Sequence, residues 1–354
     1  METKGIRGRG ADANPPNRFE PLAYVPDADA RDPDEPGPRT ELFRDPSRTI
    51  IATNDSPDVG FDASVNPYRG CEHGCIYCYA RPTHEYLGFS AGLDFETKIL
   101  VKEDAPELLR RELSSRRWTP RVIALSGVTD PYQPVERRLG ITRRCLEVLV
   151  EYRNPVAIIT KNHLVTRDID LLGELARYDA VGVNVSVTTL DEKLQRVMEP
   201  RASIPARRLA AIEALARAGI PVRVLVAPVV PGLTDHELPR IIDAAAKAGA
   251  CAAGYIVLRL PHGVAGLFEG WLDRHAPGRK AKILNRVREL RGGKLNDGRF
   301  GVRMRGEGIW AGQISAIFHA ACRKAGLATR LPPLSTAAFR RPDPVGQLDF
   351  FGTE

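Results

Sequence analysis

The sequence of 354 residues lacks any apolar run long enough to span a bilayer. Its first ten residues, Met-Glu-Thr-Lys-Gly-Ile-Arg-Gly-Arg-Gly, also lack the apolar segment of a secretory signal peptide. The first absence argues against a membrane-spanning protein. The second predicts a cytoplasmic protein whose thiols stay reduced.

Acidic residues are the minority among the charged side chains. There are 44 Asp and Glu residues against 51 Lys and Arg residues, which gives a net charge of +7. This balance favours polyanionic partners without identifying one. The hydrophobic content of 43% supports a substantial core, and the length fits one large domain or two small ones.

Cysteine is scarce, yet three of the six cysteines lie close together at Cys71, Cys75 and Cys78. The next cysteine in the chain is Cys145, so no fourth thiol lies near this group and no second cysteine cluster is visible. A disulfide framework is excluded because the group is odd in number and the chain shows no export signal. Soft thiolates at such a spacing suit an iron–sulfur cluster. In a four-iron cluster, three thiolates leave one iron without a protein ligand.

Two other metal sites compete with this interpretation. A structural zinc site requires four ligands, and His73 or His84 would have to complete it. His73 lies between two of the cysteines in a tight loop and is poorly placed to bind the same ion. A ferredoxin-like site would require a fourth cysteine in a tighter run. The spacing therefore favours a four-iron cluster with one open iron.

The stretch around the cysteines resembles a known family. Ile76-Tyr77-Cys78 resembles the signature of radical S-adenosylmethionine (SAM) enzymes, and Gly-Cys-Ile-Tyr-Cys-Tyr-Ala at 74–80 resembles the branch that contains spore photoproduct lyase. The resemblance covers roughly residues 60 to 260. It implies a [4Fe-4S] cluster whose open iron binds SAM, and one-electron cleavage of SAM to a 5′-deoxyadenosyl radical. It also implies a flavodoxin- or ferredoxin-type electron donor.

From residue 60 onward, apolar strands alternate with helices. Strands are expected at 61–66, 122–126, 156–160, 181–187, 221–226 and 254–258, with helices at 105–117, 142–152, 167–178, 205–218 and 235–248. Thr142 is a candidate helix cap. This pattern predicts an α/β fold with a parallel sheet, and the resemblance implies a partial (βα)6 TIM-like barrel. The domain prediction is a disordered or extended segment at 1–48, interpreted as a solvated tail, then a core at 49–260, a basic extension at 261–330 that closes the barrel, and a flexible tail at 331–354.

Several residues at the predicted strand ends are candidates for binding SAM, because catalytic groups of such folds lie at the C-terminal ends of strands. The resemblance implies that Ser126, Gly127 and Asp130 meet the SAM amino group. It implies that Lys161 faces the carboxylate. Further candidates are Ser186, Ala227 beside the adenine, and Tyr77 within the cysteine loop. For Val226 a plain core role is equally consistent, and Glu199-Pro200-Arg201 is a guess for a substrate or SAM neighbour.

One departure from the lyase branch concerns the hydrogen-atom donor. In that branch the loop after the second strand carries a catalytic thiol, but Ser126 and Gly127 occupy that place here. A serine O–H bond is far harder to homolyse than a thiol S–H bond, and the three remaining cysteines have the character of core residues. The lyase reaction is therefore not transferred to this chain. Tyr79 and Tyr132 are hypotheses for a radical relay.

Two further segments suggest partners. Residues 279–305 carry ten basic and two acidic side chains, a net charge of +8, which suits nucleic-acid phosphates or is simply a solvated basic face. A helix and then a hairpin-like turn are expected there, with a final helix at 309–324. Arg7 and Arg9, among glycines, are also candidates for touching nucleic acid. Gln347 to Phe351 resembles the peptide by which bacterial proteins dock on the sliding clamp, or is a tail that folds back.

Three functions remain open from the sequence. The first is a radical SAM enzyme that acts on DNA or another nucleic acid. The second is a radical SAM enzyme that modifies a protein or small molecule. The third is a non-enzymatic iron–sulfur or zinc protein.

Overall fold

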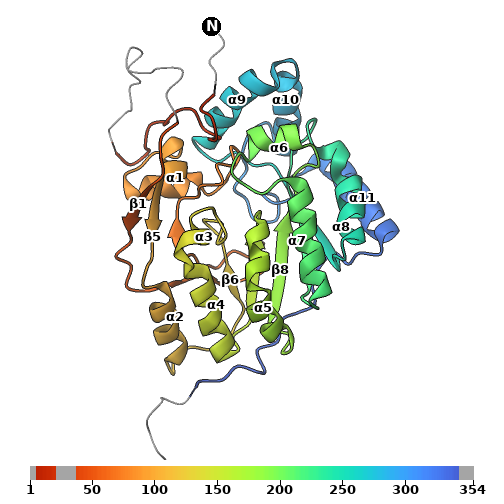
Figure 1. The fold of residues 1–354 in the computed structure, drawn as a ribbon. Coiled ribbons are helices and arrows are strands. Elements are labelled where there is room, and N and C mark those ends of the chain that lie inside the picture. The colour runs from red at the N-terminus through yellow and green to blue at the C-terminus, as the bar shows by residue number, and fades with distance from the viewer. Residues whose placement is uncertain (1–4, 21–36, 343–354) are drawn as a thin grey trace, which may run out of the picture.

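The computed structural model describes residues 5–20 and 37–342 (Figure 1). Its main sheet has the strand order β10-β9-β8-β7-β6-β3-β2. The six strands from β3 to β10 in this order pair in parallel, whereas β2 is antiparallel to β3. The bounds are β2 (Ile51–Thr53), β3 (Ala63–Val65), β6 (Ile123–Leu125), β7 (Val156–Thr160), β8 (Val181–Ser186), β9 (Val222–Val229) and β10 (Ala252–Val257). The predicted α/β fold, a partial six-stranded parallel barrel, is confirmed.

The strands form where the sequence has unbroken apolar runs. All six residues of β8 are buried, and β7 begins and ends at the predicted residues. Both faces of a parallel sheet are covered, so the strands are apolar over most of their length rather than on alternate residues only. The C-terminal ends of these strands consequently open into one shared region, which positions the site described below.

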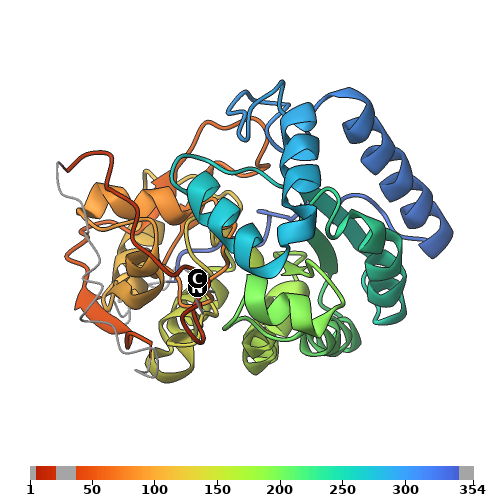
Figure 2. The ribbon, with the colours of Figure 1, turned by 90° about the horizontal axis from the view of Figure 1, so that it is seen from above.

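Helices cover the outer face of the sheet. These are α2 (Ala105–Ser114), α4 (Ile141–Tyr152), α5 (Ile169–Ala176), α7 (Pro205–Arg217) and α8 (Leu238–Lys247). The last helix, α11 (Gly308–Ala325), packs beside α8, and the rings of Phe318 and Tyr255 lie 4.7 Å apart. Seen from above, α9 (Val264–His275) and α10 (Lys280–Leu290) lie over the end of the molecule where the parallel strands finish (Figure 2). Among the helices of residues 5–20 and 37–342, none is both long and apolar enough to cross a bilayer.

Two details of the helices differ from the prediction. Thr142 does not cap α4, because the helix begins at Ile141 after Gly140, whose φ is +64°. The Thr142 hydroxyl is buried and donates instead to the Pro131 carbonyl at 2.6 Å. The helix expected at 167–178 is divided into a 3₁₀ segment, η2 (His163–Asp168), followed by α5. Asn162 caps η2, since its side chain accepts the Leu164 N–H.

A second, smaller sheet lies beside the barrel. It contains β1 (Glu41–Arg44), β4 (Tyr68–Arg69) and β5 (Lys98–Val101) in the order β1-β5-β4. This sheet was not predicted, because strands of two to four residues carry little periodic signal and β1 is exposed along its whole length.

Residues 5–20 pack against the protein, unlike the solvated tail expected for this part of residues 1–48. Ala11 is buried, and the backbone N–H groups of Gly10 and Ala11 donate to the Glu96 carboxylate at 2.9 and 2.8 Å. The Asn17 amide donates to the carbonyls of Glu85 and Phe89, each at 2.9 Å. Local composition does not reveal these contacts, because the partners lie some 70 to 90 residues further along the chain.

Residues 327–341 cross the end of the barrel at which the strands begin (Figure 1). Ala328 pairs with Ala252, the Ser335 N–H donates to the Asp179 carbonyl at 2.9 Å, and the Arg340 N–H donates to the Tyr152 carbonyl at 3.0 Å. The prediction of a flexible tail from residue 331 is therefore wrong for residues 331–341, because backbone groups of this stretch are paired with the core. The predicted clamp-binding peptide, Gln347 to Phe351, lies outside the described residues.

Candidate functional site

The three cysteines lie on one loop that follows β4. Cys71 and Cys75 are each 7% exposed, and Cys78 is only partly buried. The loop is fastened at both ends, since the Cys71 N–H donates to the Phe95 carbonyl at 2.9 Å and the Ile76 N–H donates to the Met198 carbonyl at 3.0 Å. These bonds fix the loop to two segments that are distant in sequence, so the thiols are presented on a held rather than a free backbone.

Close packing leaves no room for side chains at two glycines of this region. Gly74 has a φ of +67°, and a Cβ placed on it would lie 2.7 Å from Glu96 Oε2. A Cβ on Gly10 would lie 1.8 Å from the Gly74 carbonyl oxygen. The N-terminal segment therefore rests directly on the cysteine loop, and glycine is required at both contacts.

A buried ion pair supports the loop from beneath. Arg81 and Glu96 are both fully buried, and Arg81 Nη2 lies 2.5 Å from Glu96 Oε1. The Arg81 guanidinium also donates to the Cys75 carbonyl at 3.0 Å and to the Gly92 carbonyl at 2.9 Å. Because Glu96 also accepts from the N-terminal segment, this pair joins three parts of the chain at the cysteine loop. Neither residue's role could be predicted from the sequence.

The two histidines considered as zinc ligands are both buried, His73 in a hydrogen-bond network and His84 among aromatic rings. The His73 Nδ1 lies 3.3 Å from Asp130 Oδ2, and its Nε2 lies 3.2 Å from the Asn162 amide nitrogen. Burial alone would lower the pKa of His73, but the Asp130 carboxylate and the Cys71 thiol raise it. His84 is fully buried between the rings of Phe89 and Phe95. Neither imidazole is oriented to complete a fourth ligand position.

The burial of His84 predicts that acid destabilises the fold. Burial lowers the pKa of this imidazole from 6.5 to about 4, so the unfolded chain binds a proton at a higher pH than the folded chain. The contribution of neutral His84 to stability is fully present above pH 6.5. The free energy of unfolding should fall by up to about 3 kcal/mol as the pH drops from 6.5 to 4. Urea unfolding at a series of pH values measures this slope.

The variant His84→Leu should flatten this pH dependence, because it removes the titrating group while keeping an apolar side chain. His319→Leu is the matched control, since His319 is exposed on α11 and should keep the slope of the unchanged protein. An unchanged slope in His84→Leu would contradict the assignment.

Three of the predicted SAM-binding residues meet at the ends of β7, β8 and β9. Lys161 Nζ donates to Ser186 Oγ at 2.7 Å and to the Ala227 carbonyl at 3.2 Å, and Ser186 Oγ donates to that carbonyl at 3.1 Å. The structure thus brings together residues that are up to 66 positions apart in the chain. Val226, by contrast, is 1% exposed and belongs to the main hydrophobic core.

Glu199, which the sequence suggested as a neighbour of the substrate or of SAM, lies at the centre of this group. It is fully buried and accepts from the hydroxyls of Tyr77 and Thr188 and from the Arg208 guanidinium, while Lys161 Nζ lies 3.9 Å away. Burial alone would raise the pKa of Glu199, but the charges of Arg208 and Lys161 lower it to about 2. The carboxylate is therefore ionised and couples Tyr77 of the cysteine loop to the ends of the strands.

The loop after β6 has a different arrangement from the one expected. Ser126 and Gly127 have positive φ angles of 151° and 133°, and the Ser126 hydroxyl donates to the Thr129 carbonyl at 2.9 Å. Asp130 is already occupied, since Oδ1 accepts the Thr160 hydroxyl at 2.7 Å and Oδ2 accepts the Lys161 backbone N–H at 2.8 Å. Asp130 therefore holds the start of the Lys161 loop and the His73 ring.

The two candidate relay tyrosines lie in unlike surroundings. Tyr79 is 48% exposed, donates its hydroxyl to the Gly127 carbonyl at 2.6 Å, and has the Arg259 guanidinium 4.5 Å above its ring. Tyr132 is fully buried within the main core. Only Tyr79 combines access to solvent with a place beside the cysteine loop.

The thiols influence one another's ionisation. Burial, and then the charge of Glu199, raise the pKa of Cys75 well above its usual value, and Cys78 and Cys71 raise it further. Among the described residues, no three His, Cys, Asp or Glu side chains are arranged to hold a single metal ion. A cationic centre shared by the thiols would remove the repulsion that disfavours their ionised forms.

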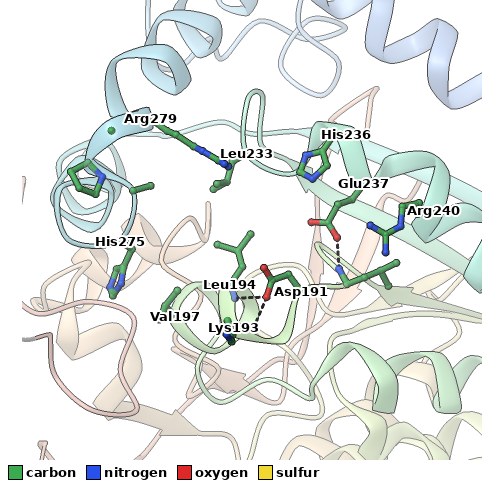
Figure 3. A pocket seen from close by; sticks show the side chains of 14 residues that line it. Asp191, Lys193, Leu194, Val197, Leu233, His236, Glu237, Arg240, His275 and Arg279 are labelled. Carbon is green, nitrogen blue, oxygen red and sulfur yellow. Dashed lines mark hydrogen bonds between the residues drawn. The ribbon is translucent and has the colours of Figure 1, made fainter.

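A cavity of about 770 Å³ lies apart from the cysteines, between α6 (Glu192–Met198), the start of α8 and the segment that joins α9 to α10. Figure 3 shows His275 and Arg279 on one side of it and His236, Glu237 and Arg240 on another. Leu194, Val197 and Leu233 supply an apolar floor. None of the three cysteines lines this cavity, so its size alone does not make it the chemical site.

Residues 279–305 are less basic in the fold than in the sequence. The predicted helix is present as α10, but residues 300–305 form turns instead of a hairpin. Acidic partners from other parts of the chain neutralise several of its cations, in the pairs Lys280–Asp273, Arg286–Asp235 and Arg303–Asp58, and Arg299 pairs with Asp297 and Glu307. Arg291 is buried against backbone carbonyls. The net charge of +8 thus overstates the positive charge that a ligand would meet at this segment.

Comparisons with known proteins agree with this geometry. The Radical SAM superfamily profile matches residues 65–245. An uncharacterised protein of Mycobacterium tuberculosis is 40% identical over 232 residues, which is 65% of this chain and 67% of the relative. A Pseudomonas phage M6 protein named radical SAM Nalpha-GlyT isomerase is 30% identical over 175 residues, covering 49% of this chain and 34% of that protein.

The fold is also similar to a solved structure, spore photoproduct lyase complexed with dinucleoside spore photoproduct. The TM-score is 0.58 with 17% identity, over 80% of this chain and 79% of that chain. At this identity the likeness concerns the fold. The family profile, which spans half of the chain and includes the cysteine loop and the strand ends, carries the assignment. This protein is an enzyme that belongs to the radical SAM superfamily.

Proposed function

We propose that this enzyme binds a [4Fe-4S] cluster through Cys71, Cys75 and Cys78, binds SAM at the ends of the parallel strands, and acts on nucleic acid. The observation that carries the proposal is the meeting of the cysteine loop with Lys161, Ser186 and Glu199 at one end of the barrel. When bound, the cluster would supply the electron that cleaves SAM to a 5′-deoxyadenosyl radical.

The donor set fits such a cluster. Three thiols on one loop match the soft ligands that iron–sulfur clusters require, and His73 is held by Asp130 and Asn162. Arg81 holds the Cys75 carbonyl from a fully buried position, so the loop is shaped before a cluster arrives. Such preorganisation lowers the cost of binding.

SAM recognition is assigned to side chains at the strand ends. Lys161 Nζ lies at the strand ends, 2.7 Å from Ser186 Oγ and 3.9 Å from the Glu199 carboxylate, and an ammonium group placed there is suited to pair with the SAM carboxylate. Ser126 and Gly127 turn their backbone through unusual φ angles, a kind of strain that is found at ligand sites. We assign the SAM amino group to this loop, Ser186 and Ala227 to the adenosine side, and Tyr77 and Asp130 to positioning.

A nucleic-acid substrate is supported by one protein of similar fold. The solved spore photoproduct lyase is complexed with a dinucleoside. Because this chain has Ser126 and Gly127 where the lyase branch has a thiol, the reaction must differ in its hydrogen-atom donor. We propose Tyr79 for that role, since it is half-exposed beside the cysteine loop. A flavodoxin- or ferredoxin-type protein would supply electrons.

The experiment that tests this function is 5′-deoxyadenosine release by protein reconstituted with iron and sulfide, reduced in the presence of SAM. We expect release, and we expect damaged or modified DNA to increase it. If DNA does not change the amount of 5′-deoxyadenosine released, the substrate is to be sought among proteins or small molecules. No release from protein that carries its full complement of iron would overturn the proposal.

A further inference from the structure

A cavity of about 740 Å³ lies on the outer side of the cysteine loop, and arginine dominates its walls. The six arginines that line it come from the N-terminal segment, from the approach to β1, from α3 (Glu136–Leu139) and from the turn after α6, and they are Arg7, Arg9, Arg39, Arg137, Arg138 and Arg201. Glu72 is the one carboxylate among the lining residues that the structure describes. No comparable gathering of one charge lines the cavity of Figure 3.

Two of these arginines form a rigid floor. Arg9 donates to the Glu96 carbonyl at 2.9 Å and to the Pro38 carbonyl at 2.5 Å. Arg201 Nη1 lies 2.9 Å from Glu72 Oε1, and the Thr40 hydroxyl donates to the same oxygen at 2.8 Å. These contacts hold the cavity in shape without neutralising Arg9, which has only backbone and hydroxyl partners.

The other four arginines have no acidic partner among the residues that the structure describes. Arg7, Arg39, Arg137 and Arg138 are exposed, and none of their side chains forms a hydrogen bond or ion pair with another residue of the described chain. Like charges around one cavity repel each other, and an anion that enters it relieves this repulsion. Each guanidinium also presents a planar fork that matches phosphate oxygens.

The lining indicates which anion fits. Among the described residues that line it there is no tyrosine, phenylalanine or tryptophan on which a base could stack, and the apolar side chains are limited to valine, leucine and proline. Single-stranded nucleic acids and free nucleotides are commonly bound by stacking, whereas a duplex backbone is held by phosphate contacts alone. A broad arginine-lined surface without rings therefore suits a phosphodiester backbone.

We propose that this cavity binds the phosphate backbone of a duplex nucleic acid. The inference rests on the proposed function and specifies where the substrate is held. It assigns the contact to the N-terminal segment and α3 instead of residues 279–305, where four of the ten cations are paired with carboxylates within the fold.

The cavity is joined directly to the cysteine loop. Glu72 follows Cys71, and its N–H donates to the side-chain oxygen of Gln133 at 2.9 Å. The Arg201 N–H donates to the His73 carbonyl at 3.2 Å. Gln133 also leads into α3. A backbone bound here would consequently touch residues that hold the loop, which would place the substrate close to the chemical centre.

The test compares two pairs of adjacent arginines. Binding of a short fluorescein-labelled DNA duplex to the reconstituted enzyme is followed by fluorescence anisotropy over a series of KCl concentrations. For Arg137→Glu/Arg138→Glu we expect Kd to rise about tenfold or more, and the slope of log K against log salt to fall by about two. Arg116→Glu/Arg117→Glu is the matched control, since these arginines are exposed near the end of α2 and should leave both quantities unchanged.

A third variant, Arg279→Glu/Lys282→Glu, tests the competing basic segment at residues 279–305, and its DNA affinity should stay unchanged. The inference would be overturned if Arg137→Glu/Arg138→Glu kept the DNA affinity of the wild type, or if Arg116→Glu/Arg117→Glu lost as much affinity. The inference would also be overturned if a phosphorylated peptide displaced the DNA probe at a lower concentration than unlabelled duplex does. Deoxyadenosine release without DNA should be normal in every variant. If the wild-type enzyme releases deoxyadenosine but binds no DNA, both the proposed substrate and this binding site are wrong. If the wild-type enzyme binds DNA and Arg137→Glu/Arg138→Glu binds it equally well, only the proposed site is wrong.

Discussion

Replacing Cys75 with serine should leave an enzyme that releases no 5′-deoxyadenosine above background. The thiolate is a soft ligand with high affinity for iron, whereas a serine hydroxyl stays protonated and binds iron poorly. Cys75 is 7% exposed and its carbonyl is held by Arg81, so no other side chain is positioned to replace it. Iron and sulfide content, together with deoxyadenosine measured by chromatography, test this result.

The matched control for this variant is Cys251→Ser. Cys251 is exposed just before β10, at the opposite end of the barrel from the cysteine loop, and its thiol contacts only the Val222 carbonyl. Iron content and release should therefore be normal in the control. Full iron loading and turnover in Cys75→Ser would contradict the assignment of the cluster ligands.

Arg208→Met should lower the free energy of unfolding by about 3 to 5 kcal/mol, the range found when one partner of a buried ion pair is removed. Arg208 is 1% exposed and Glu199 fully buried, and Arg208 also donates to the Ser186 carbonyl at 3.0 Å. Without the guanidinium, the buried carboxylate loses its largest stabilising charge and its pKa rises from about 2. Guanidinium chloride unfolding followed by circular dichroism measures the change.

Arg207→Met provides the control for this substitution, one residue away on α7. Arg207 is exposed and its guanidinium lies 3.2 Å from His163 Nδ1, so its loss should change the unfolding free energy by less than about 0.5 kcal/mol. Equal destabilisation by the two variants would show that the helix tolerates neither change. It would remove the special role given to the buried pair.

The regular part of the fold could be predicted from the sequence because its signals are local. The strand at 156–160 is a continuous apolar run bounded by Pro155 and Lys161, and its limits match β7. The cysteine spacing is also local. The meeting of Lys161 with Ser186 could be predicted because side chains that follow parallel strands share one edge of the sheet.

The remaining features depend on partners that are distant in sequence. Arg208 lies in an Ala-Arg-Arg-Leu stretch, and nothing there distinguishes the buried arginine from the exposed Arg207. The charge of residues 279–305 was overestimated for the same reason, since Asp58, Asp235 and Asp273 lie outside the segment that was counted. The N-terminal contacts to Glu96 were missed because a glycine-rich segment gives no periodic signal.

The strip at residues 327–341, which covers the base of the strands, also constrains how the protein is made. Its partners at Asp179 and Tyr152 leave the ribosome about 150 residues or more before the strip itself does. A nascent chain can thus pair all six parallel strands while their base, where Gly182 later meets Leu331, is still open to water. Such long-range closure slows folding and exposes apolar surface to aggregation. Chaperone binding to stalled nascent chains should therefore persist until this final stretch has emerged.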